Sequence, residues 1–189
     1  MNIAVENLTL NDVKLINSEV YHDNRGYYME TYNNNDLEKI IKDEFVQDNL
    51  SYNKSKNTFR GFHYQEPPYT QSKLVRVVKG SVLDVIIDLR GNSTTYLEYV
   101  TVPLNDNNKS ILYVPKGFAH AFITLEDDTI LEYKVDSLYN KEHSRTFSMN
   151  ILEKDYGINY IMSDSDKNAM TFDEENNPFI DWTSDENCN

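Results

Sequence analysis

The chain has a single cysteine among its 189 residues, Cys188, so it cannot form an internal disulfide. It has no apolar run that approaches the roughly 18 to 20 residues that a membrane-spanning helix requires. Its first residues, MNIAVENLTLNDVKL, lack the basic-then-apolar layout of a signal peptide. We therefore expect a soluble cytoplasmic protein, with no membrane partner.

Basic residues are also scarce. Lys and Arg number 18 against 31 Asp and Glu, which gives a formal net charge of −13. A protein that binds nucleic acid needs a basic face for the phosphates, so we predict no nucleic-acid partner. An acidic shell does not exclude a small basic pocket. The length is typical of one domain that buries a core without a metal or disulfide.

Metal-ligand patterns are missing as well. The sequence has no His-x-His pair, and the one Glu shortly after His63, Glu66, stands before two prolines. A catalytic metal usually has three protein ligands, so we predict no metal site.

What the chain does have is aromatic residues and alternation. Fourteen Tyr and eight Phe suit a pleated sheet. Residues 81–90 alternate with period two, with Val85 and Ile87 on one face and Asp84 and Ile86 on the other. One or two short strands are predicted within residues 1–20, and further strands near residues 27–32, 45–51, 96–102, 110–114, 121–125 and 129–135. Turn signals separate them, which indicates an antiparallel sandwich or barrel.

Helices are predicted only at the periphery. Asn35, followed by Glu38, predicts an N-cap and a short helix. Residues 163–166 are expected to begin a second helix over 167–169. We expect residues 155–162 to pack along the outside and residues 179–182, within the acidic tail, to dock on the sheet.

The candidate chemistry is concentrated in residues 57–90. His63 lies beside a Gly-containing bend, as does His120 later in the chain, whereas His22 and His143 lie in polar turns and are predicted to be surface residues. A hydrogen-bonded structural histidine remains the commoner alternative for any one of them. Arg60 suits phosphate recognition and Lys73 suits a developing oxyanion, although either could be a solvated surface cation.

Tyr133 shares strand parity with Leu131 and Val135, so its side chain is predicted to point inward. A buried Tyr is usually a core residue whose hydroxyl is hydrogen-bonded, but it can also donate a proton to an anion in front of it.

Several motifs in the same order resemble those of the dTDP-4-dehydrorhamnose 3,5-epimerase family, over roughly residues 10 to 170. They are Asp23-Asn-Arg25-Gly26, Gln47-Asp-Asn49, Arg60-Gly-Phe-His63-Tyr-Gln65, Lys73-Leu-Val-Arg76-Val-Val-Lys-Gly80, Asp84-Val-Ile-Ile-Asp88-Leu-Arg90, Val114-Pro-Lys-Gly-Phe-Ala-His120-Ala-Phe122 and Tyr133-Lys-Val-Asp-Ser-Leu-Tyr139.

The resemblance implies an all-β, cupin-type antiparallel jelly roll with short peripheral helices. It implies an isomerase without metal or cofactor, which forms a homodimer by exchanging N-terminal strands. The chain would be one epimerase domain over 1–189: N-terminal strands and a short helix to about residue 50, a jelly-roll core over 51–140, and a C-terminal segment with the acidic tail over 141–189.

The resemblance also implies a mechanism, in which a nucleoside-diphosphate 4-keto-6-deoxy sugar is deprotonated and reprotonated beside its ketone. His63 would be the base, paired with Asp166, while Lys73 would hold the enolate oxygen and Tyr133 would be the acid. The implied binding residues are Arg60, His120, Gln47, Asp48 and Asn49 for the sugar and diphosphate, Tyr139 for stacking on the base, and Arg25 and Glu30 from a partner subunit. Because Arg60 and His63 would point to opposite faces of an unbroken strand, a bulge or twist at Gly61 is required.

Two places depart from the family pattern: residues 141–145, which read Lys-Glu-His-Ser-Arg, and Ser165 just before Asp166. Both lie toward the nucleotide end, so the base, the hexose or heptose, and inversion at C3, C5 or both stay open. A sugar 3,4-ketoisomerase and a non-catalytic sugar-nucleotide binding cupin are alternatives. Capsule, lipopolysaccharide and antibiotic-sugar biosynthesis are all compatible with the sequence.

Overall fold

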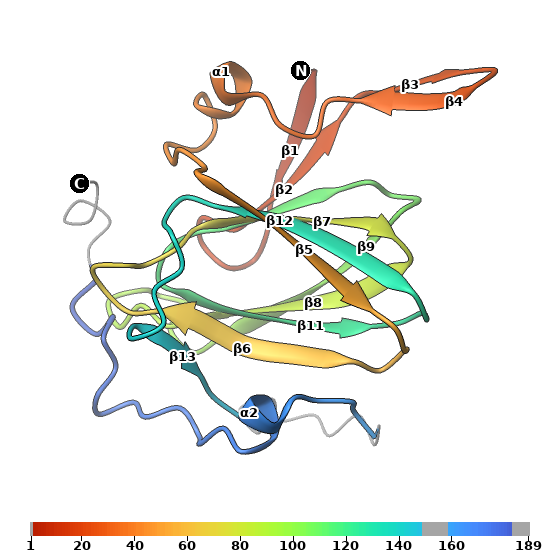
Figure 1. Ribbon diagram of the computed structural model, residues 1–189. Helices are drawn as coiled ribbons and strands as arrows, with labels where there is room; N and C mark the ends of the chain where they lie inside the picture. Colours follow the sequence, from red (N-terminus) through yellow and green to blue (C-terminus); the bar gives the residue numbers. More distant parts are fainter. Residues whose placement is uncertain (1, 149–158, 183–189) are drawn as a thin grey trace.

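A computed structural model describes residues 2–148 and 159–182 and shows two antiparallel sheets that stack face to face (Figure 1). The six-stranded sheet has the order β1-β2-β10-β7-β12-β5, and the five-stranded sheet has the order β13-β6-β11-β8-β9. The six are β1 (Ile3–Asn7), β2 (Lys14–Ser18), β5 (Gln47–Asn53), β7 (Lys73–Lys79), β10 (Ile111–Val114) and β12 (Thr129–Val135). The five are β6 (Phe59–Gln65), β8 (Ser81–Asp88), β9 (Tyr99–Asn105), β11 (Phe118–Thr124) and β13 (Ser144–Thr146).

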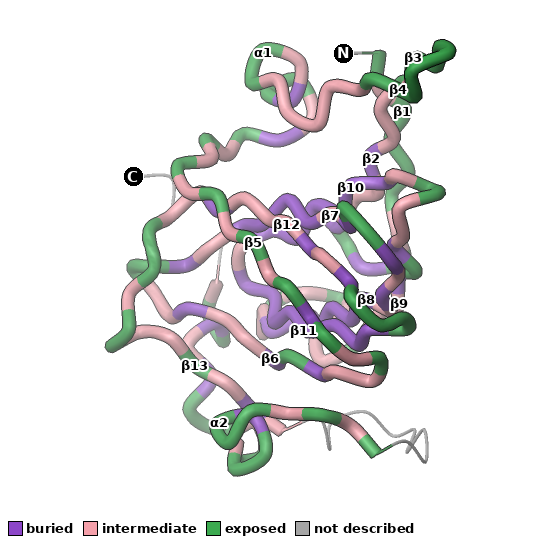
Figure 2. Tube along the Cα trace, turned by 45° about the vertical axis from the view of Figure 1, so that its right-hand side comes forward, coloured by how far each residue is buried: buried purple, intermediate pink, exposed green. Residues whose placement is uncertain are grey.

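The main core lies between the sheets. Figure 2 shows buried residues on strands of both sheets, among them β7, β8, β10 and β11. Val75 and Val77 of β7 face Val82 and Ile86 of β8, and all four are at most 4% exposed. The predicted period-two strands thus supply alternate residues to this layer, and burying each such side chain typically contributes roughly 1.5 to 3 kcal/mol.

A second core covers the other face of the five-stranded sheet. Val85 and Ile87 of β8 pack there with aromatic side chains that include Phe59, Phe62 and Phe179. Phe179 is 1% exposed, which confirms that the 179–182 segment docks. Both faces of β8 are therefore buried, which explains its nearly continuous apolar sequence.

The two short helices begin earlier than their sequence signals indicated. Helix α1 spans Asn34–Leu37, and its N-cap is Asn33, whose side chain makes no capping hydrogen bond. Apolar burial holds this helix, because Leu37 packs against Ile16 and Leu74 on the outer face of the six-stranded sheet.

Helix α2 spans Asp164–Lys167 and lies below β6 in Figure 1. The hydroxyl of Ser163 accepts a hydrogen bond from the backbone N–H of Asp166, so the helix starts there rather than at residue 167. Of the predicted outer segment 155–162, residues 155–158 lie outside the described part, and Ile161 exchanges backbone hydrogen bonds with residues 57 and 59.

The N-terminal region contains a hairpin of β3 (Val20–Asp23) and β4 (Gly26–Met29), which projects away from the two sheets (Figure 1). Its tyrosines, Tyr21, Tyr27 and Tyr28, are each more than half exposed. In the described residues, no helix is long and apolar enough to cross a membrane.

Candidate active site

A cavity of about 670 Å³ opens between the two sheets, where β5 and β12 face β6 and β11. Among the described residues that line it there is no Asp or Glu, although the chain carries a net charge of −13. The ionisable nitrogen-bearing residues of the lining are Arg60, His63, Lys73, His120, Lys141 and Arg145. This distribution favours an anionic ligand.

Strand parity places three of the predicted residues in the cavity. Lys73 follows the same inward parity as Val75, and His120 the same parity as Phe122. Tyr133 packs against the main core beside Leu131, which agrees with its predicted inward orientation. The cavity thus receives side chains from both sheets.

A bulge in β6 brings Arg60 and His63 to the same cavity. His63 lies opposite His120 of β11 and Arg60 lies opposite Phe122, so three steps along β6 match two along β11. Gly61 sits within this bulge with a φ of 138°, a region that favours glycine. A Cβ at Gly61 would lie 2.3 Å from the Cβ of Ala121, so a larger residue has no room. The predicted need for irregularity at Gly61 is confirmed.

His63 pairs with Asp166 across a large sequence separation. Its Nε2 donates to Oδ1 of Asp166 at 2.9 Å, and the side chain of His63 is 45% exposed while that of Asp166 is 5% exposed. Burial alone would raise the pKa of Asp166, but hydrogen bonds from His63 and from Ser163 outweigh it and lower that pKa. Asp166 is therefore an ionised partner that orients the imidazole.

Lys73 lies deep in the cavity. It is 8% exposed, and its Nζ approaches the carbonyl oxygen of His63 at 3.4 Å. Burial lowers the pKa of Lys73 to about 8, although the nearby charge of Asp84 acts in the opposite direction. Close to neutral pH this lysine is thus still mainly a cation.

Tyr133 remains a phenol at neutral pH. Burial raises its pKa, and the charge of Arg60 only partly offsets that rise. It stands on β12, opposite the sheet that carries His63, so a ligand in the cavity has the imidazole on one side and the phenol on the other.

His120 forms a second histidine–aspartate pair. Its Nε2 donates to Oδ1 of Asp84 at 2.7 Å, and both residues are buried. The sequence argument did not include Asp84 in the site, although a carboxylate on the face of β8 that carries Val82 and Ile86 was a visible signal.

Three predicted binding residues on β5 lie next to the cavity without lining it. Asn49 is directly opposite Tyr133 in the strand register. The side-chain amide of Gln47 donates a hydrogen bond to the side chain of Asn49 at 2.7 Å and accepts one from the backbone N–H of Tyr139 at 3.3 Å. Asp48 has the opposite parity and forms an ion pair with Lys134 at 2.6 Å. Tyr139 itself lines the cavity mouth and is 61% exposed.

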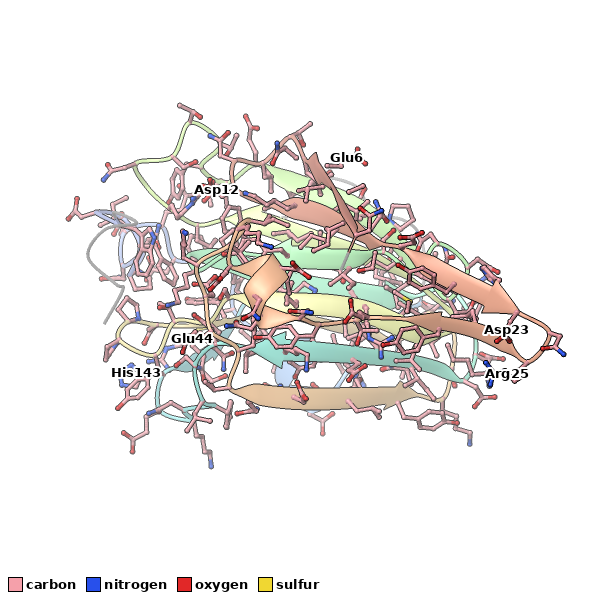
Figure 3. All side chains as sticks on the ribbon, turned by 90° about the horizontal axis from the view of Figure 1, so that it is seen from above. Glu6, Asp12, Asp23, Arg25, Glu44 and His143 are labelled. Atoms are coloured by element: carbon pink, nitrogen blue, oxygen red, sulfur yellow. The ribbon has the colours of Figure 1, made fainter. Side chains whose placement is uncertain are left out.

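Arg25 and Glu30 do not line the cavity of their own chain. Arg25 forms an ion pair with Asp23 at the hairpin tip, and its side chain is 85% exposed. Figure 3 shows this tip at one end of the molecule and His143 at the other. Glu30 accepts a hydrogen bond from the side chain of Asn33 at 3.5 Å.

The mouth contributes residues that the sequence argument had treated only as departures from a pattern or had not singled out. Lys141 and Ser165 line it together with Tyr64 and Arg145, and Arg145 forms an ion pair with Glu66 at 2.6 Å. His22 is exposed, as predicted. His143 was also predicted to be a surface residue but is half-buried, with its ring centroid 4.7 Å from that of Tyr69. The reason is that residues 140–143 fold back onto the turn after β6. Within the described residues, no three His, Cys, Asp or Glu side chains form a group that could hold a metal ion.

Comparisons with known proteins agree with this geometry. The sequence model of the family described as dTDP-4-dehydrorhamnose 3,5-epimerase matches residues 7–174. The chain belongs to this family. A relative from Shigella flexneri named dTDP-4-dehydrorhamnose 3,5-epimerase is 41% identical over 170 residues, which covers 85% of this chain and 91% of the relative.

Two solved structures of the family superpose closely. The epimerase of Bacillus anthracis with TDP and PPi bound has a TM-score of 0.86 and 37% identity, covering 90% of this chain and 99% of that one. The 3,5-epimerase of Legionella pneumophila, in complex with dTDP-4-keto-L-rhamnose, has a TM-score of 0.85 and 34% identity over 90% of this chain and 93% of that one. The predicted antiparallel cupin-type fold and the assignment to the isomerases are confirmed.

Proposed function

We propose that this epimerase inverts C3, C5 or both in a nucleoside-diphosphate 4-keto-6-deoxy sugar, with His63 as base, Tyr133 as acid and Lys73 as the group that binds the enolate. The observation that carries the proposal is that these side chains enter one cavity from opposing sheets, and that the described residues of its lining include no carboxylate. The TDP and dTDP-sugar bound to the two solved relatives support a thymidine carrier for this chain as well.

The ketone at C4 makes the hydrogens at C3 and C5 acidic. Because Nε2 of His63 donates to Asp166, Nδ1 is the basic nitrogen, and it accepts the proton from carbon. The electron pair of the broken C–H bond moves onto the ketone oxygen, forming an enolate. Tyr133 then gives its proton to the opposite face of the same carbon, which inverts it. The imidazolium then releases its proton to solvent and the phenolate takes one up, so both groups are restored and no cofactor is consumed.

Lys73 stabilises the enolate oxygen. An ammonium held at 8% exposure acts in a low-dielectric environment, where one such interaction commonly contributes roughly 3 to 4 kcal/mol to the transition state. His120 and Arg60 position the sugar. Asp166 holds His63 in one tautomer and stabilises the imidazolium.

The diphosphate and the nucleotide base of the substrate lie toward the mouth of the cavity. Lys141 and Arg145 supply positive charge there, and the exposed ring of Tyr139 supplies a stacking surface for the base. Gln47 and Asn49 support this end, since Gln47 binds the backbone of Tyr139.

A homodimer is part of the proposal. The projecting β3–β4 hairpin exposes three tyrosines, a surface that a second copy would cover. Arg25 and Glu30 would then reach the cavity of that copy, and Asp48 would stay at its rim. A mixture of two inactive variants, Arg25→Ala and His63→Asn, should regain activity through mixed dimers that assemble one intact site, and no gain would contradict the exchange.

We also propose that residues 1–189 form one catalytic domain, because β1 and β2 complete the six-stranded sheet and Phe179 packs on the five-stranded one.

The test is incubation of dTDP-linked 4-keto-6-deoxyglucose with the enzyme in D2O. Deuterium at C3 and C5 with inversion of both supports a 3,5-epimerase, and deuterium at one carbon identifies a single-site enzyme. Movement of the carbonyl to C3 would identify a ketoisomerase, and no deuterium at either carbon would indicate a protein that only binds. The same assay with UDP- and GDP-linked sugars establishes the carrier.

A further inference from the structure

Asp84 is a fully buried carboxylate on β8, and its side chain has the same parity as Val82 and Ile86 of the core between the sheets. Burying a charge there costs several kcal/mol unless the charge is paired and hydrogen-bonded. Its Oδ1 accepts one hydrogen bond, from His120, while its Oδ2 is buried with no hydrogen-bond partner. One hydrogen bond does not account for a carboxylate at this depth.

The compensating charge lies on the opposite sheet. Lys73 of β7 points into the same interior and is almost as deeply buried. Among the described residues, the one hydrogen bond of its ammonium is the long contact with the carbonyl oxygen of His63. An uncompensated lysine at this depth would lose its proton near neutral pH, and the charge of Asp84 opposes that loss.

We propose that Asp84 is a positioning residue that keeps Lys73 cationic and fixes His120 with its Nε2–H toward the carboxylate. The inference rests on the proposed function of Lys73 as the group that binds the enolate. The titratable or charged groups that line the cavity with Lys73 are His63 and Arg60 on β6, His120 on β11 and Tyr133 on β12. The lining also contains Tyr52, Tyr64, Tyr139, Lys141 and Arg145. In the described part of the chain, two buried carboxylates are hydrogen-bonded to these groups, Asp166 to His63 and Asp84 to His120. Asp84 is the one whose charge opposes the deprotonation of Lys73.

The consequence is a specific alkaline limb in the pH profile of kcat, that is, a fall of kcat as the pH rises. In the wild-type enzyme, kcat should fall as the pH rises through about 8, because burial lowers the pKa of Lys73 to about 8 and the ammonium loses its proton there. Asp84→Asn keeps the shape and removes the charge, so burial then lowers the pKa of Lys73 unopposed. We expect the alkaline limb to move down by roughly one pH unit or more, with activity within about threefold of wild type at pH 6 and about tenfold lower at pH 8.

The control is His120→Asn, which leaves Asp84 in place. It should lower kcat at all pH values without moving the limb toward lower pH. Asp84→Ser, which is also uncharged, is made in parallel in case the asparagine does not fold. Lys73→Arg should abolish the limb, because an arginine does not deprotonate in this range.

A readout without substrate separates this inference from the proposed function. Lysines carrying ¹³C at Cε are titrated by NMR, with Lys73→Met to assign the signal. The expected result is a Lys73 pKa that drops in both folded Asp84 variants, even if the enzyme proves to act on another substrate. A Lys73 pKa unchanged in those variants, or a loss of kcat uniform with pH, would overturn the inference.

Discussion

Two histidines on neighbouring strands of the same sheet each pair with an aspartate. The two pairs differ in where the aspartate comes from and in how exposed the histidine is. His63 and His120 are directly opposite each other in the register of β6 and β11. Asp166 reaches His63 from α2, 103 residues further along the chain, whereas Asp84 reaches His120 from the adjacent strand β8. The side chain of His63 is 45% exposed, and that of His120 is 8% exposed.

The difference shows how one sheet can use the same pair of groups for two tasks. A proton-transferring imidazole must reach the substrate, and the bulge at Gly61 turns His63 toward the cavity with a carboxylate behind it. The buried pair has less room to move a proton, and we propose that it instead maintains the charge of Lys73 and the orientation of His120. In this proposal, the exposure of the side chain, more than its hydrogen-bond partner, distinguishes the base His63 from the positioning residue His120.

Exchanging the two histidines for asparagine should give the largest contrast. His63→Asn removes the base and should lower kcat by about 10²- to 10⁴-fold, since general-base catalysis contributes that much. His120→Asn should lower it by about 10- to 100-fold. The measurement is steady-state turnover of both variants, with thermal denaturation as a control for folding, and equal losses would contradict the division of roles.

Asp166→Asn should have a smaller effect, because the base remains but loses its orienting carboxylate. We expect kcat to fall by about 10- to 100-fold with little change in KM. A variant in which KM rises and kcat is unaffected would mean that Asp166 binds substrate rather than orienting His63.

The same carboxylate predicts a pH effect on stability. Because the folded pKa of Asp166 lies below the ordinary value of 3.8, its contribution is fully present above that value and is lost as the pH falls through the folded pKa. The decline of Tm between pH 5 and pH 2.5 should therefore be shallower in Asp166→Asn than in the wild type. Parallel curves of Tm against pH for the two proteins would contradict a stabilising contribution from ionised Asp166.

Much of the fold was predictable from the sequence because period-two alternation on strands such as β8 and β12 is a local signal. Tyr133 was placed inward on the same ground. The predicted start of α1 at Asn35 was wrong, since the apolar burial of Leu37, a tertiary contact, outweighs the cap that Asn35 would offer. Asp84 was visible as a carboxylate on an apolar strand, but its proposed role depends on Lys73 of the opposite sheet, and the pairing of sheets is not visible in local periodicity.

Substitutions at the mouth of the cavity should have the smallest effects. Lys141→Glu reverses a charge near the proposed diphosphate position and should raise the Kd for TDP by about tenfold at low salt, with a smaller effect at 0.5 M NaCl. Lys79→Glu, at the opposite end of β7 from Lys73 and exposed, makes the same charge change outside the cavity. Calorimetry on both variants is the measurement, and equal effects would show that net charge alone is responsible.

The most direct test of the account separates proton removal from inversion in single-turnover reactions in D2O. Tyr133→Phe should still incorporate deuterium beside the ketone, through His63, but return it to the original face without inversion. His63→Asn should incorporate none, with the 4-keto sugar recovered unlabelled. Deuterium incorporation at the wild-type rate in His63→Asn, or full inversion in Tyr133→Phe, would contradict the placement of base and acid on opposing sheets.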